Sequence, residues 1–109
     1  MATAYKTLGQ QAPSATTSTD LYTVPALTSA IVSTITIANR AATDSTFRIS
    51  QSVAGAALAN KDYLVYDATI PGSGFITLTL GVTMATTDKL RVYASTANLS
   101  FSAFGTEIS

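Results

Sequence analysis

Apolar and polar residues alternate along most of this chain, which is the period of β-strands that bury one face. In residues 75–80, for example, Ile76, Leu78 and Leu80 point to one side, and two threonines point to the other. No segment keeps a helical period over more than a turn or two. Eight segments carry the strand pattern: residues 3–8, 20–25, 26–38, 46–53, 63–70, 75–80, 90–94 and 99–104.

The longest strand signal, residues 26–38, predicts one apolar face and one hydroxyl-bearing face. A regular strand places three isoleucines on one side together with Ser33, and two threonines on the other side together with Val32. A sheet with one solvated side is expected to show this division. The isoleucines are Ile31, Ile35 and Ile37, and the threonines are Thr34 and Thr36.

Residues 63–67 form the most aromatic point of the chain. In a regular strand Tyr63 and Tyr66 lie on opposite faces, so we expect one in the core and one near the surface. The same alternation separates Asp62 from Asp67, which could pair only across a bulge. The preceding residues 54–61 are predicted to be a loop with room for one turn of helix, and this loop is the favoured place for partner contact.

Turn signals recur about every ten residues, as at residues 71–74, which read Pro-Gly-Ser-Gly. Seven or eight short strands without crossover helices predict one antiparallel β-sandwich of jelly-roll type. We expect residues 1–19 to form a short strand and a flexible arm, and residues 20–109 to form the sandwich. The arm would be either a disordered terminus or a segment that docks on a neighbouring subunit.

The composition favours association. Of the 109 residues 47% are hydrophobic and only 11% are charged, which suggests that neighbouring subunits cover some apolar surface. A well-filled sandwich with alanines on its surface is the alternative. The net charge is zero and the six cationic residues are scattered, which argues against binding to nucleic acid or an anionic membrane. No apolar run approaches the roughly 20 residues of a membrane span, so we expect a soluble protein made in the cytoplasm.

The chain has few residues of the types that usually carry out catalysis. The chain has no histidine and no cysteine, so it lacks the commonest general base, the commonest metal ligand and any thiolate. Its serines have no neighbouring base, and no Ser-x-x-Lys spacing occurs. The acids do not form a calcium loop, and the glycines do not form a phosphate loop. The sequence therefore predicts no enzyme activity and no catalytic, cofactor or metal site.

Two arginines are expected on solvated strand faces. Arg48 and Arg91 occupy outward positions, from which they could pair with Asp67 or Asp88 across a sheet. The five tyrosines could instead form a platform for sugars. The absence of tryptophan, and the expected separation of Tyr63 from Tyr66, favour core or interface roles for these rings.

Short motifs spread from about residue 5 to residue 109 carry a resemblance to a known family. They are LGQQAP (8–13), LYTVP (21–25), IANR (37–40), TFRI (46–49), LANKDY (58–63), LTLG (78–81), VYAS (92–95) and LSFSAFGTEI (99–108). In this order they resemble small virion structural proteins of tailed bacteriophages, many of them from phages of cyanobacteria and other aquatic bacteria. Such proteins are variously named virion, tail or fibre proteins. The resemblance implies a particle component and brings no catalytic residues.

These observations together predict an accessory decoration or cement protein on the capsid of a tailed phage, made in the host cytoplasm. Expected partners are the major capsid protein or tail proteins and further copies of the chain, a trimer being one option. The alternatives are a tail, neck or baseplate component that attaches fibres and, from another class, a host-glycan-binding module. Strand edges and the terminal segments 2–12 and 104–109 would make the contacts. The expected interface residues are Tyr5, Leu8, Arg48, Leu58, Asn60, Lys61, Tyr66, Arg91, Phe104 and Ile108.

Overall fold

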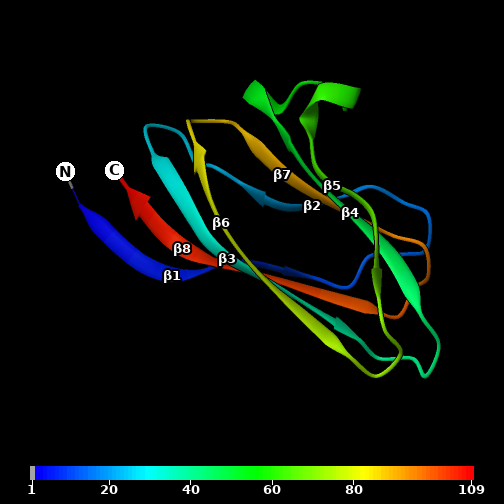
Figure 1. Ribbon diagram of the computed structural model, residues 1–109. Coiled ribbons are helices and arrows are strands. Elements are labelled where there is room, and N and C mark those ends of the chain that lie inside the picture. The colour runs from blue at the N-terminus through cyan, green and yellow to red at the C-terminus, as the bar shows by residue number, and fades with distance from the viewer. Residues whose placement is uncertain (1) are drawn as a thin grey trace.

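Two four-stranded antiparallel sheets pack face to face in the computed structural model, which describes residues 2–109 (Figure 1). The predicted all-β sandwich is confirmed, with eight strands. Two short 3₁₀ turns, η1 (Val53–Gly55) and η2 (Asn60–Asp62), lie in the loop where a turn of helix was expected. The strands are β1 (Thr3–Gln11), β2 (Thr19–Thr23), β3 (Ser29–Asn39), β4 (Ser45–Ser52), β5 (Tyr63–Ile70), β6 (Phe75–Met84), β7 (Lys89–Ala94) and β8 (Leu99–Ile108).

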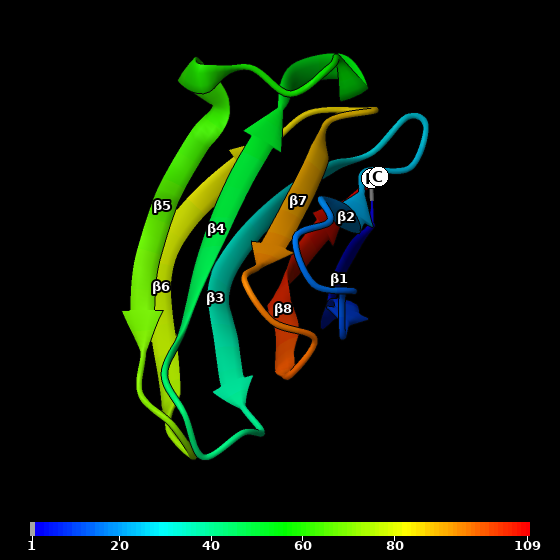
Figure 2. The same cartoon turned by 90° about the vertical axis from the view of Figure 1, so that its right-hand side faces the viewer.

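The strand order is that of a jelly roll. Sheet A has the order β1-β8-β3-β6, and sheet B has the order β2-β7-β4-β5. Only the connection from β4 to β5 stays within one sheet, and every other connection crosses between the sheets. In Figure 2, β5 and β6 form one side of the sandwich, and β1 and β2 form the other. Because β1 and β8 are neighbours, the two ends of the chain meet, and Ala2 and Ser109 exchange backbone hydrogen bonds of 2.8 and 2.9 Å.

The core fills the space between the sheets. At its centre Phe47 of β4 and Phe101 of β8 meet edge to face, with ring centroids 6.2 Å apart. Burial of each large apolar side chain stabilises the fold by about 1.5–3 kcal/mol. Leucine, isoleucine and valine side chains from both sheets surround this pair, among them Val32, Ile35, Ile37, Ile49, Ile70, Leu90, Val92 and Leu99.

The predicted faces of β3 are wrong in the first half of the strand. Ser33 is an extra residue against β8, because Val32 pairs with Gly105 while Thr34 pairs with Phe104. This bulge reverses the alternation, since an inserted residue moves the following side chains to the other face. Val32 is therefore fully buried, and Ile31 is 41% exposed.

The predicted alternation in β5 is also wrong, because β5 carries two bulges. Leu64 is an extra residue between the pairs Ile49↔Val65 and Ser50↔Tyr63. Further along, Tyr66 and Asp67 together face Arg48 alone, and Asp67 takes a positive φ of 52°. The bulges bring Tyr63 and Tyr66 to the same face, where their rings meet at right angles with centroids 4.9 Å apart.

The two terminal segments expected to act as tethers are parts of sheet A. Residues 9–11, predicted to belong to a flexible arm, continue β1, which pairs with β8 from Thr3↔Ile108 to Gln11↔Phe101. Residues 104–108 lie in β8, which is paired on both sides. Ladder pairing satisfies the backbone groups of β8 on both sides and those of β1 on the side that faces β8. β1 also comes close to sheet B at Gly9, where an added Cβ would lie 2.0 Å from the carbonyl oxygen of Leu21.

Candidate interaction surfaces

The outer face of sheet B carries a cluster of arginine and tyrosine side chains. The guanidinium of Arg48 donates two hydrogen bonds to Asp67, Nε to Oδ1 at 2.6 Å and Nη2 to Oδ2 at 3.2 Å. Its carbon Cζ lies 4.2 Å from the ring centroid of Tyr66 and 4.3 Å from that of Tyr93. The expected pairing of Arg48 with Asp67 is confirmed. This hydrogen bonding lowers the pKa of Asp67, because it stabilises the charged carboxylate.

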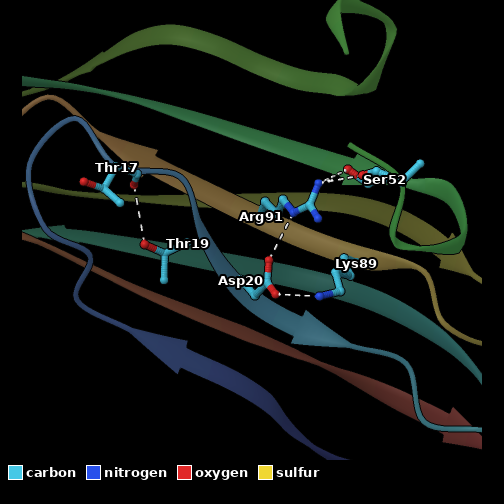
Figure 3. Close-up of polar contacts among 7 residues, drawn as sticks. Thr17, Thr19, Asp20, Ser52, Lys89 and Arg91 are labelled. Carbon is cyan, nitrogen blue, oxygen red and sulfur yellow. Dashed lines mark hydrogen bonds and ion pairs between the residues drawn. The ribbon is translucent and has the colours of Figure 1, made fainter. Parts of the chain in front are cut away.

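A second charged cluster occupies the same face (Figure 3). Asp20 of β2 accepts from Lys89 Nζ at 2.9 Å and from Arg91 Nε at 3.1 Å. Arg91 Nη1 also donates to the Ser52 hydroxyl and to the carbonyl of Ala56, both at 2.8 Å. The hydrogen bond from Lys89 is the largest cause of the lowered pKa of Asp20. The expected partners of Arg91, Asp67 or Asp88, are therefore wrong, because β2 rather than β5 flanks β7 on this side.

We call this outer face of sheet B the charged face. Its ionic groups already have partners within the chain, and its rings pack on one another or on Arg48. Surface ion pairs of this kind add little stability, but they fix the orientation of the side chains. The face comprises Asp20, Arg48, Tyr63, Tyr66, Asp67, Lys89, Arg91 and Tyr93.

A third polar network joins the two sheets near the termini. Glu107 of β8 accepts a hydrogen bond of 2.5 Å from the hydroxyl of Tyr22 and pairs with Lys6 Nζ at 2.8 Å. The contact with Lys6, followed by that with Tyr22, lowers the pKa of Glu107. Burial and the neighbouring carboxylate raise the pKa of Tyr22. Glu107 of β8 thus connects Lys6 of β1 with Tyr22 of sheet B.

Asp88 was the other acid expected to pair with an arginine, but its carboxylate instead fixes a loop. Its side chain is only 5% exposed. It accepts hydrogen bonds from the backbone N–H groups of Ala54 at 2.8 Å and Ala85 at 2.9 Å. Because these contacts satisfy the buried carboxylate, Asp88 has a structural role in holding η1 against the turn that follows β6.

The outer face of sheet A carries no charged side chain among the described residues, and we call it the uncharged face. Its centre is a ladder of hydroxyls and small groups: Thr36 lies between Thr77 and Ser102, and Thr34 lies between Thr79 and Phe104. Apolar groups interrupt this ladder. The face comprises Thr3, Tyr5, Thr7 and Gln10 of β1, Ile31, Thr34, Thr36 and Ala38 of β3, Phe75, Thr77, Thr79 and Thr83 of β6, and Ser100, Ser102, Phe104, Thr106 and Ile108 of β8.

The side of the sandwich formed by β5 and β6 contains a groove of about 360 Å³. Gln51 spans one end of it and donates from Nε2 to the carbonyl of Thr83 at 3.0 Å. Leu64 and Leu80 are 45% and 41% exposed along its walls. A second hollow of about 350 Å³ lies between residues 10–12 and 100–102. The residues that line these two hollows include no titratable side chain.

The expected interface residues are distributed over several regions. Tyr5, which is 83% exposed, belongs to the uncharged face with Phe104 and Ile108, whereas Leu8 packs against the core. Three further residues lie in the exposed loop around η2, and the remaining three belong to the charged face. The loop residues are Leu58, Asn60 and Lys61, and those of the charged face are Arg48, Tyr66 and Arg91.

Sequence reasoning missed part of both faces. Ile31 was assigned to the core and Tyr63 was separated from Tyr66, because each assignment assumed a strand without bulges. Phe75, which is 76% exposed, was not singled out. A large aromatic residue directly after the turn signal of residues 71–74 could have indicated an exposed strand end.

Comparisons with known proteins leave the chain without a family. No protein-family model matches it, and no curated protein sequence matches it significantly. Within residues 2–109, no three residues of the types that ligate metals gather in one place. In the same part of the chain, no helix is long and apolar enough to cross a membrane. The outer faces and edges of the sandwich are therefore the features from which a function can be argued.

Proposed function

We propose that this chain is a non-enzymatic structural component of a tailed-phage particle, which binds the outer surface of the capsid as a decoration or cement protein. The uncharged face of sheet A carries the proposal. The cores of protein interfaces are depleted of charged residues, because burying a charge without a partner is costly. A face of hydroxyls, small groups and separate apolar side chains avoids that cost.

Two further features support the same proposal. Jelly rolls recur among viral capsid domains, and the motifs from residue 8 to residue 108 resemble virion proteins of tailed phages. The charged face suits exposure to solvent, since its ion pairs are complete within one chain. A particle protein with one face for contact and one face for solvent would use the two surfaces in this way.

The experiment that tests the proposal is localisation of the protein in assembled particles by electron microscopy, together with a count of its copies. A capsid decoration protein is expected in hundreds of copies at equivalent capsid positions. A few dozen copies at most, located at the neck, tail or baseplate, would support the alternative of a fibre-attaching component. Absence from particles would contradict both.

The aromatic and charged cluster on sheet B favours a second candidate, a host-glycan-binding module. Lectins also use jelly rolls, and Tyr66 is 59% exposed beside the paired Arg48 and Asp67. The tyrosine ring can stack on a sugar, and the oxygens of the neighbouring carboxylate can accept hydrogen bonds from the sugar hydroxyls. Binding of the isolated protein to a glycan array, lost in Tyr66→Ala, would support this candidate. No binding to any host-surface glycan would remove it.

A further inference from the structure

The four edges of the two sheets differ in how they discourage pairing with another chain. Proteins block open strand edges with charges, prolines or bulges. The edge strand β1 carries Lys6 and is bulged at Leu8, and β2 carries Asp20 and a register shift. β5 carries Asp67 and two bulges. Each of these three edges therefore has a charge and an irregularity.

The fourth edge, β6, lacks most of these features. Its ten residues, Phe75–Met84, include no charged residue and no proline. Residues 75–79 pair with β3 without any register shift, and the irregular part begins only at Leu80 and Gly81. β6 is paired on one side only, so one row of backbone groups along its regular half faces away from the sheet. This half is a regular and open strand edge.

Exposed apolar side chains lie on and beside this strand. Phe75 and Leu80 of β6 are 76% and 41% exposed, and Leu64 of β5, which is 45% exposed, lines the same groove as Leu80. The edge of β6 thus combines unpaired backbone groups with apolar surface, the combination expected of an association site.

From this geometry we infer that β6 pairs antiparallel with β6 of a second copy of the chain, which joins the two copies of sheet A into one eight-stranded sheet. The inference goes beyond the proposed place in a virion, because it concerns the purified chain and does not depend on any particle.

Charge identifies a second copy as the occupant. In a two-fold pairing, the residue on the axis lies opposite itself and the residues on either side of it lie opposite one another, so a charge near the axis opposes its own like charge. With the axis near the middle of the strand, pairing of β1, β2 or β5 with itself would bring together Lys6, Asp20 or Asp67, respectively. β6 is the one edge among the described residues where self-pairing opposes no charges. A strongly charged partner segment would find no ionic partner on this neutral edge.

The pairing of two β6 strands also determines how the uncharged faces of the two copies are placed. A two-fold axis perpendicular to the sheet keeps both copies of the uncharged face on the same side and makes them continuous. The axis must pass through a residue of the regular half, because opposed residues share a face only at even spacing. Thr77 lies at the middle of residues 75–79 and is the simplest position for the axis. The exposed Phe75 would then lie near Thr79 of the second copy.

The first test places charges on the edge. The double substitution Thr77→Lys with Thr79→Lys puts like charges opposite each other near the axis, at two exposed positions where the monomer has room for them. The matched control is Thr7→Lys, which places lysine on the same outer face but at the opposite edge of sheet A. Sedimentation velocity over a range of concentrations should give a dimer for the parent chain and for Thr7→Lys. The double variant should be a monomer, with an unchanged circular dichroism spectrum.

The second test uses the absence of cysteine from the chain. A single cysteine at Thr77 should form a disulfide-linked dimer under mild oxidation, because an axis at this residue places its two copies opposite each other, with Cβ atoms about 4.5–5.5 Å apart. Thr7→Cys, at the far edge, should remain uncrosslinked. A parent chain that is monomeric at every concentration would overturn the inference. A trimer would also overturn it, as would a lysine double variant that still dimerises, or crosslinking of Thr7→Cys as fast as that of Thr77→Cys.

Discussion

The two outer faces of this sandwich are built from similar strands, but one is charged and the other is not. On sheet B, Asp20, Arg48 and Asp67 form ion pairs with neighbouring strands, and tyrosine rings pack on the guanidinium of Arg48. On sheet A, the charged residues Lys6 and Glu107 pair with each other, and Glu107 accepts a hydrogen bond from Tyr22 of sheet B. What remains outside sheet A is a ladder of hydroxyls with separate apolar groups.

This difference suits the two faces of one small domain to different roles, exposure to solvent and contact with a partner. Charged groups that are satisfied within one chain keep a surface hydrated, and partners gain little by covering them. A face without charges loses little when it is covered. We therefore expect substitutions on the two faces to differ most in their effect on assembly, whereas folding depends on the core that the faces share.

The largest expected effect is a difference in the free energy of unfolding between substitutions on the inner and the outer face of sheet A. Phe101→Ala should lower the free energy of unfolding by about 3–5 kcal/mol, because it opens a cavity next to Phe47. Phe104→Ala, three residues along on the outer face, should cost clearly less because Phe104 is only half-buried. Urea denaturation followed by circular dichroism measures both. Equal losses would show that the outer face is packed like a core.

The next effect concerns assembly. Ile31→Lys places a charge at an exposed position of the uncharged face, and Thr69→Lys places the same charge at an exposed position of sheet B. Attachment to particles should weaken at least about tenfold in the first variant, which corresponds to about 1.4 kcal/mol. It should stay unchanged in the second. Binding of labelled protein to particles stripped of it gives the affinities, and a loss confined to Thr69→Lys would reverse the roles of the faces.

A smaller effect is expected for the arginine cluster of the charged face. Arg48→Ala removes the two hydrogen bonds to Asp67 and the contacts with both tyrosine rings. The unfolding midpoint should fall by only a few degrees, because the pair is solvent-exposed. The pKa of Asp67, followed by NMR titration, should rise toward its ordinary value. An unchanged pKa would mean that Arg48 does not hold the carboxylate in solution.

Acid should weaken the fold through the same groups. The pKa values of Asp20, Asp67 and Glu107 are lowered in the folded chain. Their contribution to stability is therefore present above the ordinary pKa values of about 4 and is lost as the pH falls through the lowered ones. Urea midpoints should fall between pH 5 and pH 2, and less so in the triple variant Asp20→Asn, Asp67→Asn, Glu107→Gln. Identical profiles would contradict this assignment.

The smallest expected effect is that of salt on attachment. Interactions between exposed charges are screened over about 10 Å at 0.1 M salt. If the uncharged face makes the contact, the affinity for particles should change by less than about twofold between 0.05 and 0.5 M sodium chloride. A steep fall with salt would place the charged face in the contact instead.

The sequence predicted the number of strands and their approximate positions because the apolar alternation repeats between clear turn signals. It also indicated the pairing of Arg48 with Asp67 as one of its options, since Arg48 was expected at an outward strand position from which it could reach Asp67 or Asp88 across a sheet. The jelly-roll order itself, with β1 beside β8 and β7 beside β4, depends on contacts distant in sequence. Such contacts leave no local pattern.

The prediction failed where a single inserted residue changes the face of a strand. The bulge at Ser33 exposes Ile31, and the bulges at Leu64 and Asp67 bring Tyr63 to Tyr66. Bulges depend on how a neighbouring strand is positioned, and a non-glycine residue such as Asp67 gives little local sign of them. The sequence alone therefore could not identify the candidate surfaces, because it assigns residues next to these bulges to the wrong face of the sheet.

The most direct measurement of the central claim, that the uncharged face is the contact face, is the reactivity of single cysteines in assembled particles. Ala38→Cys reports on the outer face of sheet A, and Thr69→Cys reports on that of sheet B, since both positions are exposed in the isolated chain. The account predicts that a thiol reagent modifies Ala38→Cys at least about tenfold more slowly in particles than in free protein, while Thr69→Cys reacts equally fast in both. Equal reactivity of Ala38→Cys in the two states, or protection of Thr69→Cys alone, would contradict it.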